Sequence, residues 1–315
     1  TNIMLLEKDF LAEGSTGLSV GGFRQQFSHP ANILLSQESV GVFKTFQQNF
    51  GMDIDFHQVG YLFLAKKKET WDDMLLGVQT QLKHNVAVEV LTPEEIKYRW
   101  PYLNINDLQG GTFGPEDGYA DPYHVVMGYA NEARKRGVFI EEKTEVISIS
   151  INAGKVMGVK TNKGFISTSR VVNTAGPWAG EVARMAGLDL AVKPYRRQVF
   201  VITDCEFISR PVPMIIDVEN RSYFRGESAD ILAGMSDLEE PSSFNLNVDQ
   251  DFMEKVVESL IHRAPDMIRA RMLRGWAGLY TITPDDNAII GRIPELDGFY
   301  CAIGFSGHGF QHGPA

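Results

Sequence analysis

The chain has 315 residues, of which 43% are apolar and 22% are charged, which suits two globular domains with their own cores. Its formal net charge of −10 argues against a nucleic-acid partner, because phosphate contacts need a basic face. No apolar run approaches the roughly 20 residues that span a bilayer, so we expect no membrane span. The two cysteines, Cys205 and Cys301, stand outside any CxxC or metal-ligand spacing. We expect buried thiols in a reducing compartment, the cytoplasm, and no metal site.

The first residues predict a strand that ends in an acid. "IMLLE" is an apolar run closed by Glu7. In a dinucleotide-binding βαβ unit the acid at such a strand end bonds the adenosine ribose, although a strand-end acid elsewhere is a solvated side chain. Thr1 is not an initiator Met, and the chain stops at Ala315 where a helix begins, so we expect a fragment trimmed at both ends.

A glycine-rich segment follows at residues 13–27, "EGSTGLSVGGFRQQF". Its four glycines and three Ser or Thr residues predict a backbone that turns tightly or approaches a partner closely. Phe23, Arg24 and Phe27 make its end too apolar for an idle surface loop. Residues 31–51 have apolar side chains at helical spacing and predict one helix.

The next segment predicts strands and helices of a different domain. In order, the pattern predicts a strand at 56–65, a helix at 69–85, a helix capped by Thr92 and a turn-rich return at 110–122. Asp121 and Pro122 then begin another helix, and Gly137 ends it.

Three strands are predicted after that helix, at 144–151, 154–162 and 164–176, the first two joined by a short Asn-Ala-Gly turn. Pro177 begins a short helix that stops at Gly187. Residues 191–274 predict antiparallel strands interrupted by one helix at 249–264, and two further strand segments close the chain.

The predicted fold is α/β (α+β overall): a Rossmann-like cofactor domain with an inserted, mostly antiparallel substrate domain. We expect the cofactor domain to comprise residues 1–55, 119–190 and 275–315. We expect the substrate domain to comprise residues 56–118 and 191–274.

Four stretches in this order resemble the D-amino-acid-oxidase superfamily of FAD enzymes. They are "STGLSVGGFRQQF", "VVNTAGPWAG", "WAGLYTITPDDNAIIGR" and "GFSGHGFQ". Within the superfamily, the chain resembles the group of sarcosine oxidase β-subunit, glycine oxidase and proline dehydrogenase β-subunit. The GxGxxG turn that cradles the pyrophosphate would precede Thr1 by roughly thirty residues, so we expect the chain alone to bind FAD poorly.

The resemblance implies a set of cofactor contacts. They are Glu7, Ser15, Thr16, Val146, Ala175, Gly176, Trp178, Gly304, Gly307, His308 and Gly309. In such flavoproteins the closing glycine-rich turn brings backbone N–H groups to the flavin edge where negative charge develops. Some relatives attach FAD through a cysteine in the segment that matches "WAGLYT". Ala277 and Gly278 stand there, so the resemblance implies noncovalent FAD.

The resemblance also implies four catalytic residues, Arg24, Tyr223, His308 and Gln311. Arg24 falls where related amine oxidases clamp the substrate carboxylate, a task that suits the guanidinium fork; an ordinary ion pair is the alternative. Tyr223 is expected over the flavin, or else as sheet packing, and His308 as a base, or else as a structural side chain. Gln311 replaces a lysine that is a second carboxylate contact in sarcosine-oxidase-like enzymes.

The function implied is oxidation of an amine or secondary amino acid by hydride transfer to flavin N5, followed by hydrolysis of the imine. The lysine that activates oxygen in related oxidases would fall near Leu232, so a dehydrogenase with a partner subunit or electron carrier is expected. One alternative is a non-catalytic flavoprotein that assists assembly of a respiratory complex, located in the mitochondrial matrix in a eukaryote. Another is an NAD(P)-linked dehydrogenase with the same strand-end acid, which the closing glycine-rich motif disfavours.

Overall fold

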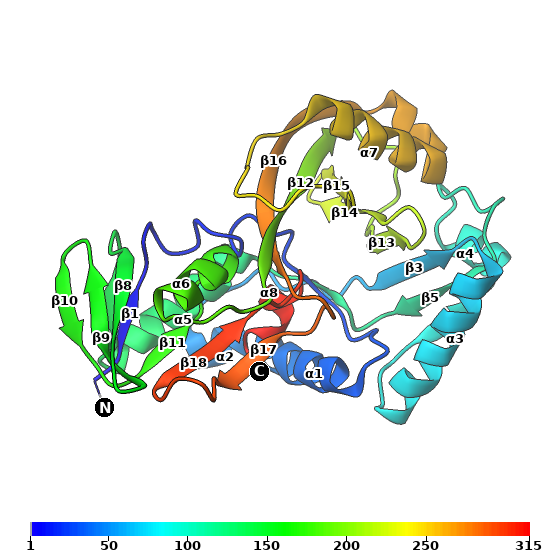
Figure 1. Cartoon of the computed structure of the whole chain (residues 1–315). Coiled ribbons are helices and arrows are strands. Elements are labelled where there is room, and N and C mark those ends of the chain that lie inside the picture. The colour runs from blue at the N-terminus through cyan, green and yellow to red at the C-terminus, as the bar shows by residue number, and fades with distance from the viewer. Residues whose placement is uncertain (1) are drawn as a thin grey trace.

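A computed structural model of the chain describes residues 2–315, and an eight-stranded sheet dominates it (Figure 1). The sheet order is β16 (Arg271–Ile282), β12 (Lys193–Thr203), β15 (Asp230–Met235), β14 (Ser222–Glu227), β13 (Met214–Asp217), β3 (Tyr61–Ala65), β5 (Gly110–Gly114) and β4 (Glu89–Leu91). Every neighbouring pair is antiparallel except β13 with β3. The predicted mostly antiparallel sheet is therefore confirmed.

The two faces of this sheet have different chemistry, because side chains alternate along each strand. One face carries apolar core residues such as Leu62, Phe200 and Phe224, and α7 (Gln250–Arg263) and α4 (Pro93–Arg99) cover it. Figure 1 shows α7 lying across the outer side of β12–β15. The register places larger polar and aromatic side chains on the opposite face, among them Tyr61, Phe63, Arg197, Tyr223, Arg225, Trp276 and Tyr280.

Shorter strands form the second part of the molecule. β1 (Met4–Leu6) pairs in parallel with β7 (Phe139–Glu141), and β11 (Val171–Asn173) pairs in parallel with β18 (Phe299–Ile303). β17 (Ile289–Arg292) is antiparallel to β18, and β8 (Val146–Asn152), β9 (Lys155–Thr161) and β10 (Gly164–Ser167) form an antiparallel meander. β2 (Gly22–Phe23) pairs with β6 (Gly118–Tyr119). The parallel pairs with their helices agree with the predicted Rossmann-like part.

The helices begin where the sequence provides caps. Thr92 forms a capping box with Glu95 at the start of α4, and the Asp121 carboxylate accepts from the backbone N–H of His124 in α5 (Pro122–Lys135). The other helices are α1 (Pro30–Lys44), α2 (Phe46–Phe50), α3 (Lys68–Lys83), α6 (Ala179–Met185) and α8 (Gly309–His312), with 3-10 turns η1 (Gly176–Trp178) and η2 (Pro265–Arg269). No helix in residues 2–315 combines the length and the apolar character needed to cross a membrane.

Three predicted elements were wrong in extent. The single helix at 31–51 is broken at Thr45, whose hydroxyl donates back to the carbonyl of Gly41, 3.1 Å away. The strand at 164–176 is two strands in different sheets, because Thr168 bonds the backbone of Arg170 and turns the chain. The strand at 56–65 forms only from Tyr61 onward.

The interior also bears on the domain prediction and the cysteine prediction. β16 runs without interruption through the expected boundary between residues 274 and 275 and pairs with β12 on both sides of it. Cys205 and Cys301 are free and buried as expected, in two separate hydrophobic clusters. Burial raises the pKa of both thiols to about 11, so they are protonated at neutral pH.

Candidate functional site

The closing glycine-rich stretch brings the backbone against the eight-stranded sheet. After β18, Gly304 (φ +71°) and Gly307 (φ +90°) adopt left-handed conformations that favour glycine. A Cβ at Gly304 would lie 2.5 Å from the methyl of Thr283, and one at Gly307 would lie 2.3 Å from the ring of Tyr280. The stretch therefore packs directly on Tyr280, and α8 follows it against α1 and β2.

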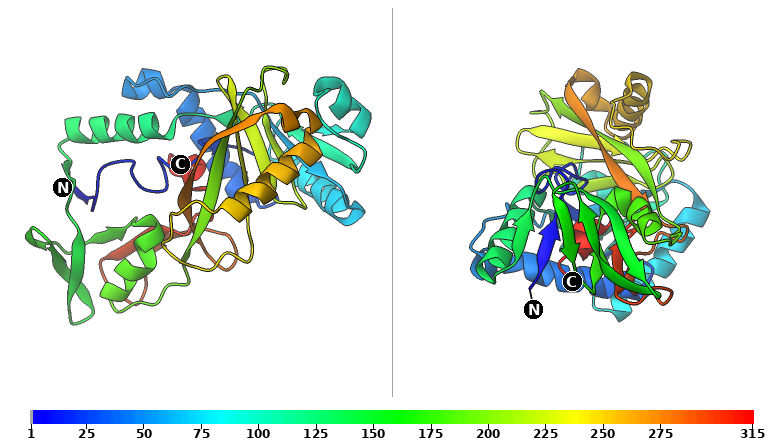
Figure 2. Two further views of the ribbon diagram at one scale, coloured as in Figure 1. Left: turned by 90° about the horizontal axis from the view of Figure 1, so that it is seen from above. Right: turned by 60° about the vertical axis from the view of Figure 1, so that its left-hand side comes forward.

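Arg24, His308 and Gln311 are brought together by this packing. The backbone N–H of Arg24 donates to Gln311 Oε1 at 2.8 Å, and Arg24 Nη2 donates to His308 Nε2 at 3.3 Å. Arg24 Nη1 also donates to the carbonyl of Gln26, and the guanidinium lies 3.7 Å from the centroid of the Phe27 ring. The left view of Figure 2 shows the N-terminal segment running from β1 toward the centre of the molecule, where α8 lies.

The two histidines of this region are neutral at physiological pH. Burial, with the nearby positive charge of Arg24, lowers the pKa of His308 to about 3 and that of His312 to about 4. Because Arg24 can only donate, Nε2 of His308 accepts and its proton lies on Nδ1. His312 Nε2 lies 3.0 Å from the hydroxyl of Ser36.

Arg24 meets residues from the polar face of the large sheet, and we call this group the arginine–tyrosine cluster: Arg24, Arg197, Tyr61, Tyr223 and Tyr280. Burial raises the pKa of all three tyrosines, so their hydroxyls keep their protons. Both Arg197 and Arg24 act on Tyr280 through their charge, opposing that rise. The guanidinium of Arg197 lies 5.4 Å from the centroid of the Tyr280 ring.

The two arginines of this cluster have no ion-pair partner in the described part of the chain, although the Asp117 carboxyl acts on Arg24 through its charge. Across residues 2–315, no carboxylate oxygen lies within 4.0 Å of a side-chain nitrogen of Arg24 or Arg197. Nε of Arg197 is buried without a hydrogen-bond partner in this part of the chain. Burial lowers the pKa of both arginines, which is the signature of charge removed from water. Since buried charges are normally paired, the cluster suits an anion.

Asp117 lies behind Arg24, and the sequence analysis missed it. It is 1% exposed; its Oδ1 accepts from the backbone N–H of Gln25 at 2.7 Å and its Oδ2 from the Gln26 amide at 3.0 Å. Burial raises the pKa of Asp117 to about 7, although these hydrogen bonds and Arg24 oppose the rise. The sequence pattern at residues 110–122, which include Asp117, predicts only a turn-rich return.

The predicted cofactor residues lie beyond the carboxyl ends of parallel strands. Glu7 follows β1, Ala175 and Gly176 follow β11, and Gly304 follows β18. In open α/β sheets this edge is where ligands bind. Because β11 and β18 pair in parallel, Ala175, Gly176 and Gly304 lie at one strand edge, whereas Glu7 follows β1 in a separate two-stranded sheet.

Other predicted cofactor residues have contacts within the chain. The Ser15 hydroxyl donates to the carbonyl of Leu279 at 2.7 Å, and the carbonyl of Thr16 accepts from Ser19. Val146 begins β8 and packs on the hydrophobic cluster of the smaller sheets.

The segments that hold Trp178 and Glu7 contact each other through Lys8. The Trp178 ring stacks on Phe244, with centroids 5.3 Å apart, and Lys8 Nζ lies 3.3 Å from its centroid. Glu7 Oε1 accepts from the backbone N–H of Asp9 at 2.8 Å.

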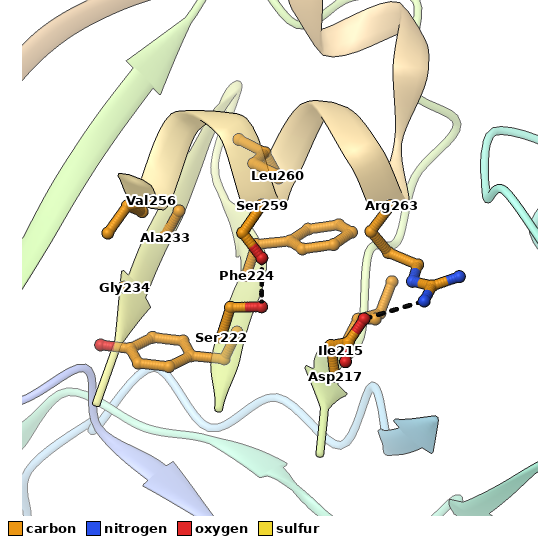
Figure 3. A pocket seen from close by; sticks show the side chains of 11 residues that line it. Ile215, Asp217, Ser222, Phe224, Ala233, Gly234, Val256, Ser259, Leu260 and Arg263 are labelled. Atoms are coloured by element: carbon orange, nitrogen blue, oxygen red, sulfur yellow. Dashed lines mark hydrogen bonds and ion pairs between the residues drawn. The ribbon is translucent and has the colours of Figure 1, made fainter. Parts of the chain in front are cut away.

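A second feature, a cavity of about 10 Å³ beneath α7, lies outside the arginine–tyrosine cluster (Figure 3). In it the hydroxyls of Ser222 and Ser259 lie 2.8 Å apart, and Arg263 pairs with Asp217 at 2.8 Å. Such a volume holds at most about one water molecule. It is a gap in core packing and no substrate site.

With this geometry established, comparison with known proteins assigns the family. The sequence profile described as "FAD dependent oxidoreductase" (DAO) matches residues 1–315. The chain belongs to this family. The protein named FAD-dependent oxidoreductase domain-containing protein 1 from Xenopus laevis is 32% identical over an alignment that covers 99% of this chain and 71% of that protein. Mitochondrial dimethylglycine dehydrogenase from Rattus norvegicus is 28% identical, with 99% of this chain covering only 38% of that protein.

Solved structures agree with this membership. L-proline dehydrogenase from P. horikoshii is 33% identical, with a TM-score of 0.91 over 99% of this oxidoreductase and 84% of that chain. Glycine oxidase from Bacillus cereus, 21% identical with a TM-score of 0.84 over 99% of this chain and 85% of the other, shares the fold.

The residues of this oxidoreductase fit the FAD that its family uses. The backbone at Gly14 and Gly176 borders open space, since a Cβ added at either would meet no atom within 4 Å. Gly176 and Gly304 lie beyond the carboxyl ends of the paired parallel strands β11 and β18, the edge at which open α/β sheets bind ligands. Among residues 2–315, no group of three or more His, Cys, Asp or Glu side chains is arranged to hold a metal ion.

Proposed function

We propose that this family member oxidises a secondary or N-substituted amino acid, with noncovalent FAD as the acceptor. One observation carries the proposal: Arg24 and Arg197 bring two positive charges without carboxylate partners to buried tyrosines. An α-carboxylate supplies the missing negative charge and accepts the guanidinium donors. The oxygen-rich substrate end is thereby held while the apolar and aromatic walls exclude water from the amine end.

The names of relatives favour an N-substituted amino acid. Sarcosine dehydrogenase from Homo sapiens, 27% identical, dimethylglycine dehydrogenase and L-proline dehydrogenase are each named for such a substrate. Arg24 is supported on both sides for this task, with its backbone held by Gln311 and its guanidinium by His308 and the Phe27 ring. We propose that it fixes the α-carbon in the orientation the reaction needs.

The proposed cofactor contacts are those of the strand edge and the glycine-rich turn. They are Glu7, Ser15, Thr16, Val146, Ala175, Gly176, Trp178, Gly304, Gly307, His308 and Gly309. When bound, FAD would supply the hydride acceptor, N5, for a C–H on a carbon next to the amine nitrogen, and the resulting imine would hydrolyse in water. Ala277 and Gly278 offer no thiol in the segment where a covalent link is expected.

His308 and Gln311 act through Arg24 in this proposal. A neutral imidazole with Nε2 already accepting from Arg24 is a weak proton acceptor, so His308 orients the guanidinium. Gln311 is 4% exposed and its amide oxygen holds the Arg24 backbone. Tyr223, on the polar sheet face, is proposed to pack over the flavin.

We favour a dehydrogenase over an oxidase. Leu232, the residue near which the oxygen-activating lysine is expected, is itself uncharged and buried in an apolar cluster with Val199 and Val201. Electrons would then pass to a partner subunit or electron carrier. The free buried thiols fit a reducing compartment, the cytoplasm or, as the names of relatives suggest for a eukaryote, the mitochondrial matrix.

Anaerobic titration of the FAD-loaded full-length protein tests the proposal. Sarcosine, L-proline and dimethylglycine are added in turn, and we expect at least one to bleach the visible flavin absorbance. Reoxidation should then be faster with an artificial dye acceptor than with oxygen. Absence of bleaching with every amino acid would overturn the proposed activity.

The second candidate is a non-catalytic flavoprotein that assists or regulates a respiratory or metabolic complex. The mitochondrial pyruvate dehydrogenase phosphatase regulatory subunit from Mus musculus, 27% identical, carries a name of this kind. The same titration separates the candidates, because such a protein would keep FAD and remain oxidised with every amino acid.

A further inference from the structure

Gln311, expected to be a second substrate contact, has its amide engaged inside the protein. Its Oε1 accepts from the Arg24 backbone at 2.8 Å, and its Nε2 lies 3.5 Å from His312 Nε2. Arg24 itself has one guanidinium donor on the Gln26 carbonyl and another on His308. A further donor from elsewhere in the chain would complete the binding of a substrate acid near Arg24.

Arg197 is the side chain that offers this donor. It lies on β12 opposite Gly278 of β16, on the polar face of the sheet with Tyr223 and Tyr280. Its Nη1 donates to the carbonyl of Arg196 at 2.8 Å, but its buried Nε has no partner among residues 2–315. A buried donor left unpaired is costly, so it calls for a ligand.

The acids nearest to Arg197 are committed to other groups. Both carboxylate oxygens of Glu240 accept from Arg196, at 3.0 and 2.9 Å. Asp237 accepts from the backbone N–H of Glu239 at 2.8 Å. Neither forms an ion pair with Arg197 in the described part of the chain. The positive charge of Arg197 is therefore available to an incoming anion.

We infer that Arg197 binds the substrate carboxylate together with Arg24 and so determines selectivity for acids over uncharged analogues. This inference rests on the proposed function and deepens it. Arg196, the preceding residue, points to the other side of the strand and is occupied by Glu240, so only the second arginine of the pair serves the site. Tyr280, on which both charges act, lies at the carboxylate end of the substrate.

Acid and amide pairs test the assignment on the FAD-loaded full-length protein. Sarcosine is compared with sarcosinamide, and L-proline with L-prolinamide, by KM and kcat in wild type and R197Q. We expect the wild type to prefer the acid, and R197Q to lose about 10- to 100-fold of that preference, the value of one charge-assisted hydrogen bond. The loss should appear as a higher KM for the acid. The kcat for the acid, and both KM and kcat for the amide, should be nearly unchanged.

Two further variants make the outcome decisive. R197K keeps the charge without the fork and should retain an intermediate preference. R274Q removes the same charge from an exposed residue on the same sheet face and should retain the wild-type preference. Calorimetry with 2-furoate, an acid without an amine, gives the same comparison without turnover.

The possible failures are distinguishable. If the wild type binds neither 2-furoate nor the acids in preference to the amides, the proposed function is wrong. If the wild type prefers acids and folded R197Q or R197K keeps the full preference, the assignment of Arg197 is overturned while the proposed function stands.

Discussion

Buried arginines at the two faces of the eight-stranded sheet differ in their ion pairing. Beneath α7, Arg263 is 2% exposed and pairs with Asp217 at 2.8 Å and with Asp107 at 3.0 Å. On the other face, Arg24 and Arg197 have no carboxylate within 4.0 Å in the described residues. Arg225, 4% exposed on the same face as Tyr223, pairs with Glu227. Arg24 and Arg197 are therefore the two buried arginines at this face that have no ion pair among the described residues, whereas Arg263 beneath α7 has two.

This difference separates a structural charge from a functional one. Removing a charge from water costs several kcal/mol, and folding stability is best served when a partner offsets that cost. A protein that leaves two such charges unpaired on one face gives up stability there. The compensation comes when an anionic ligand binds, so the unpaired pair identifies the ligand-binding face.

The largest expected effect on stability comes from removing the ion pair between Arg263 and Asp217 beneath α7. R263Q leaves Asp217 buried without its main partner and should lower the free energy of unfolding by about 3 kcal/mol, the low end for a broken buried pair because Lys66 remains 3.3 Å from Asp217. Urea unfolding of the FAD-loaded protein measures this. Acid-over-amide preference should not change.

R24Q is the matched substitution on the opposite face. It should lower the free energy of unfolding by less than about 1 kcal/mol, since it removes a charge that lacks a partner. It should raise KM for acid substrates by about 10- to 100-fold. Equal loss of stability in R24Q and R263Q would show that the two faces do not differ as we describe.

A smaller effect is expected where the closing stretch touches the cluster. G307A places a side chain in a left-handed conformation (φ +90°) and 2.3 Å from the Tyr280 ring, which should cost about 1–2 kcal/mol and displace that ring. We expect weaker binding of 2-furoate by calorimetry. G298A has a similar φ of +84° and an equally close contact with the Ser169 carbonyl, away from the cluster, and should lower stability without changing 2-furoate affinity.

The sequence predicted more of the fold than of the candidate site. The helix starts at Thr92 and Asp121 were predicted, because a side-chain cap is a local feature. The mostly antiparallel sheet followed from alternating strand patterns. The breaks at Thr45 and Thr168 were missed because each depends on a hydroxyl that bonds the backbone, which does not disturb the apolar pattern.

The site was predictable only where the family resemblance extended. It indicated Arg24, His308 and Gln311, and these lie together across more than 280 residues of sequence. Arg197 was missed because Arg196 and Arg197 are adjacent and face opposite sides. Which of them lies on the site face depends on the pairing of β12 with β15 and β16. The local sequence does not determine that register.

The smallest expected effect is on the pH dependence of stability. His308 and His312 have folded pKa values of about 3 and 4, below the ordinary value of about 6.5, so the unfolded state binds more protons below that pH and stability falls on acidification. Asp117 acts in the opposite direction: with its pKa raised to about 7, the folded state keeps a proton that the unfolded state loses, and stability falls as pH rises from about 4 to 7. Two histidines outweigh one aspartate, so acid should destabilise the protein.

D117N tests this balance by removing the opposing proton. Between pH 4 and 6.5 the loss of stability on acidification should steepen by at most about 1.4 kcal/mol per pH unit, as measured by urea unfolding at several pH values. E116Q removes the neighbouring exposed charge, which also faces Asp117, and should change the slope little. An unchanged slope in D117N would mean that folded Asp117 is ionised. Arg24 would then have a negative charge nearby after all, and Arg197 alone would distinguish the ligand-binding face from the face beneath α7.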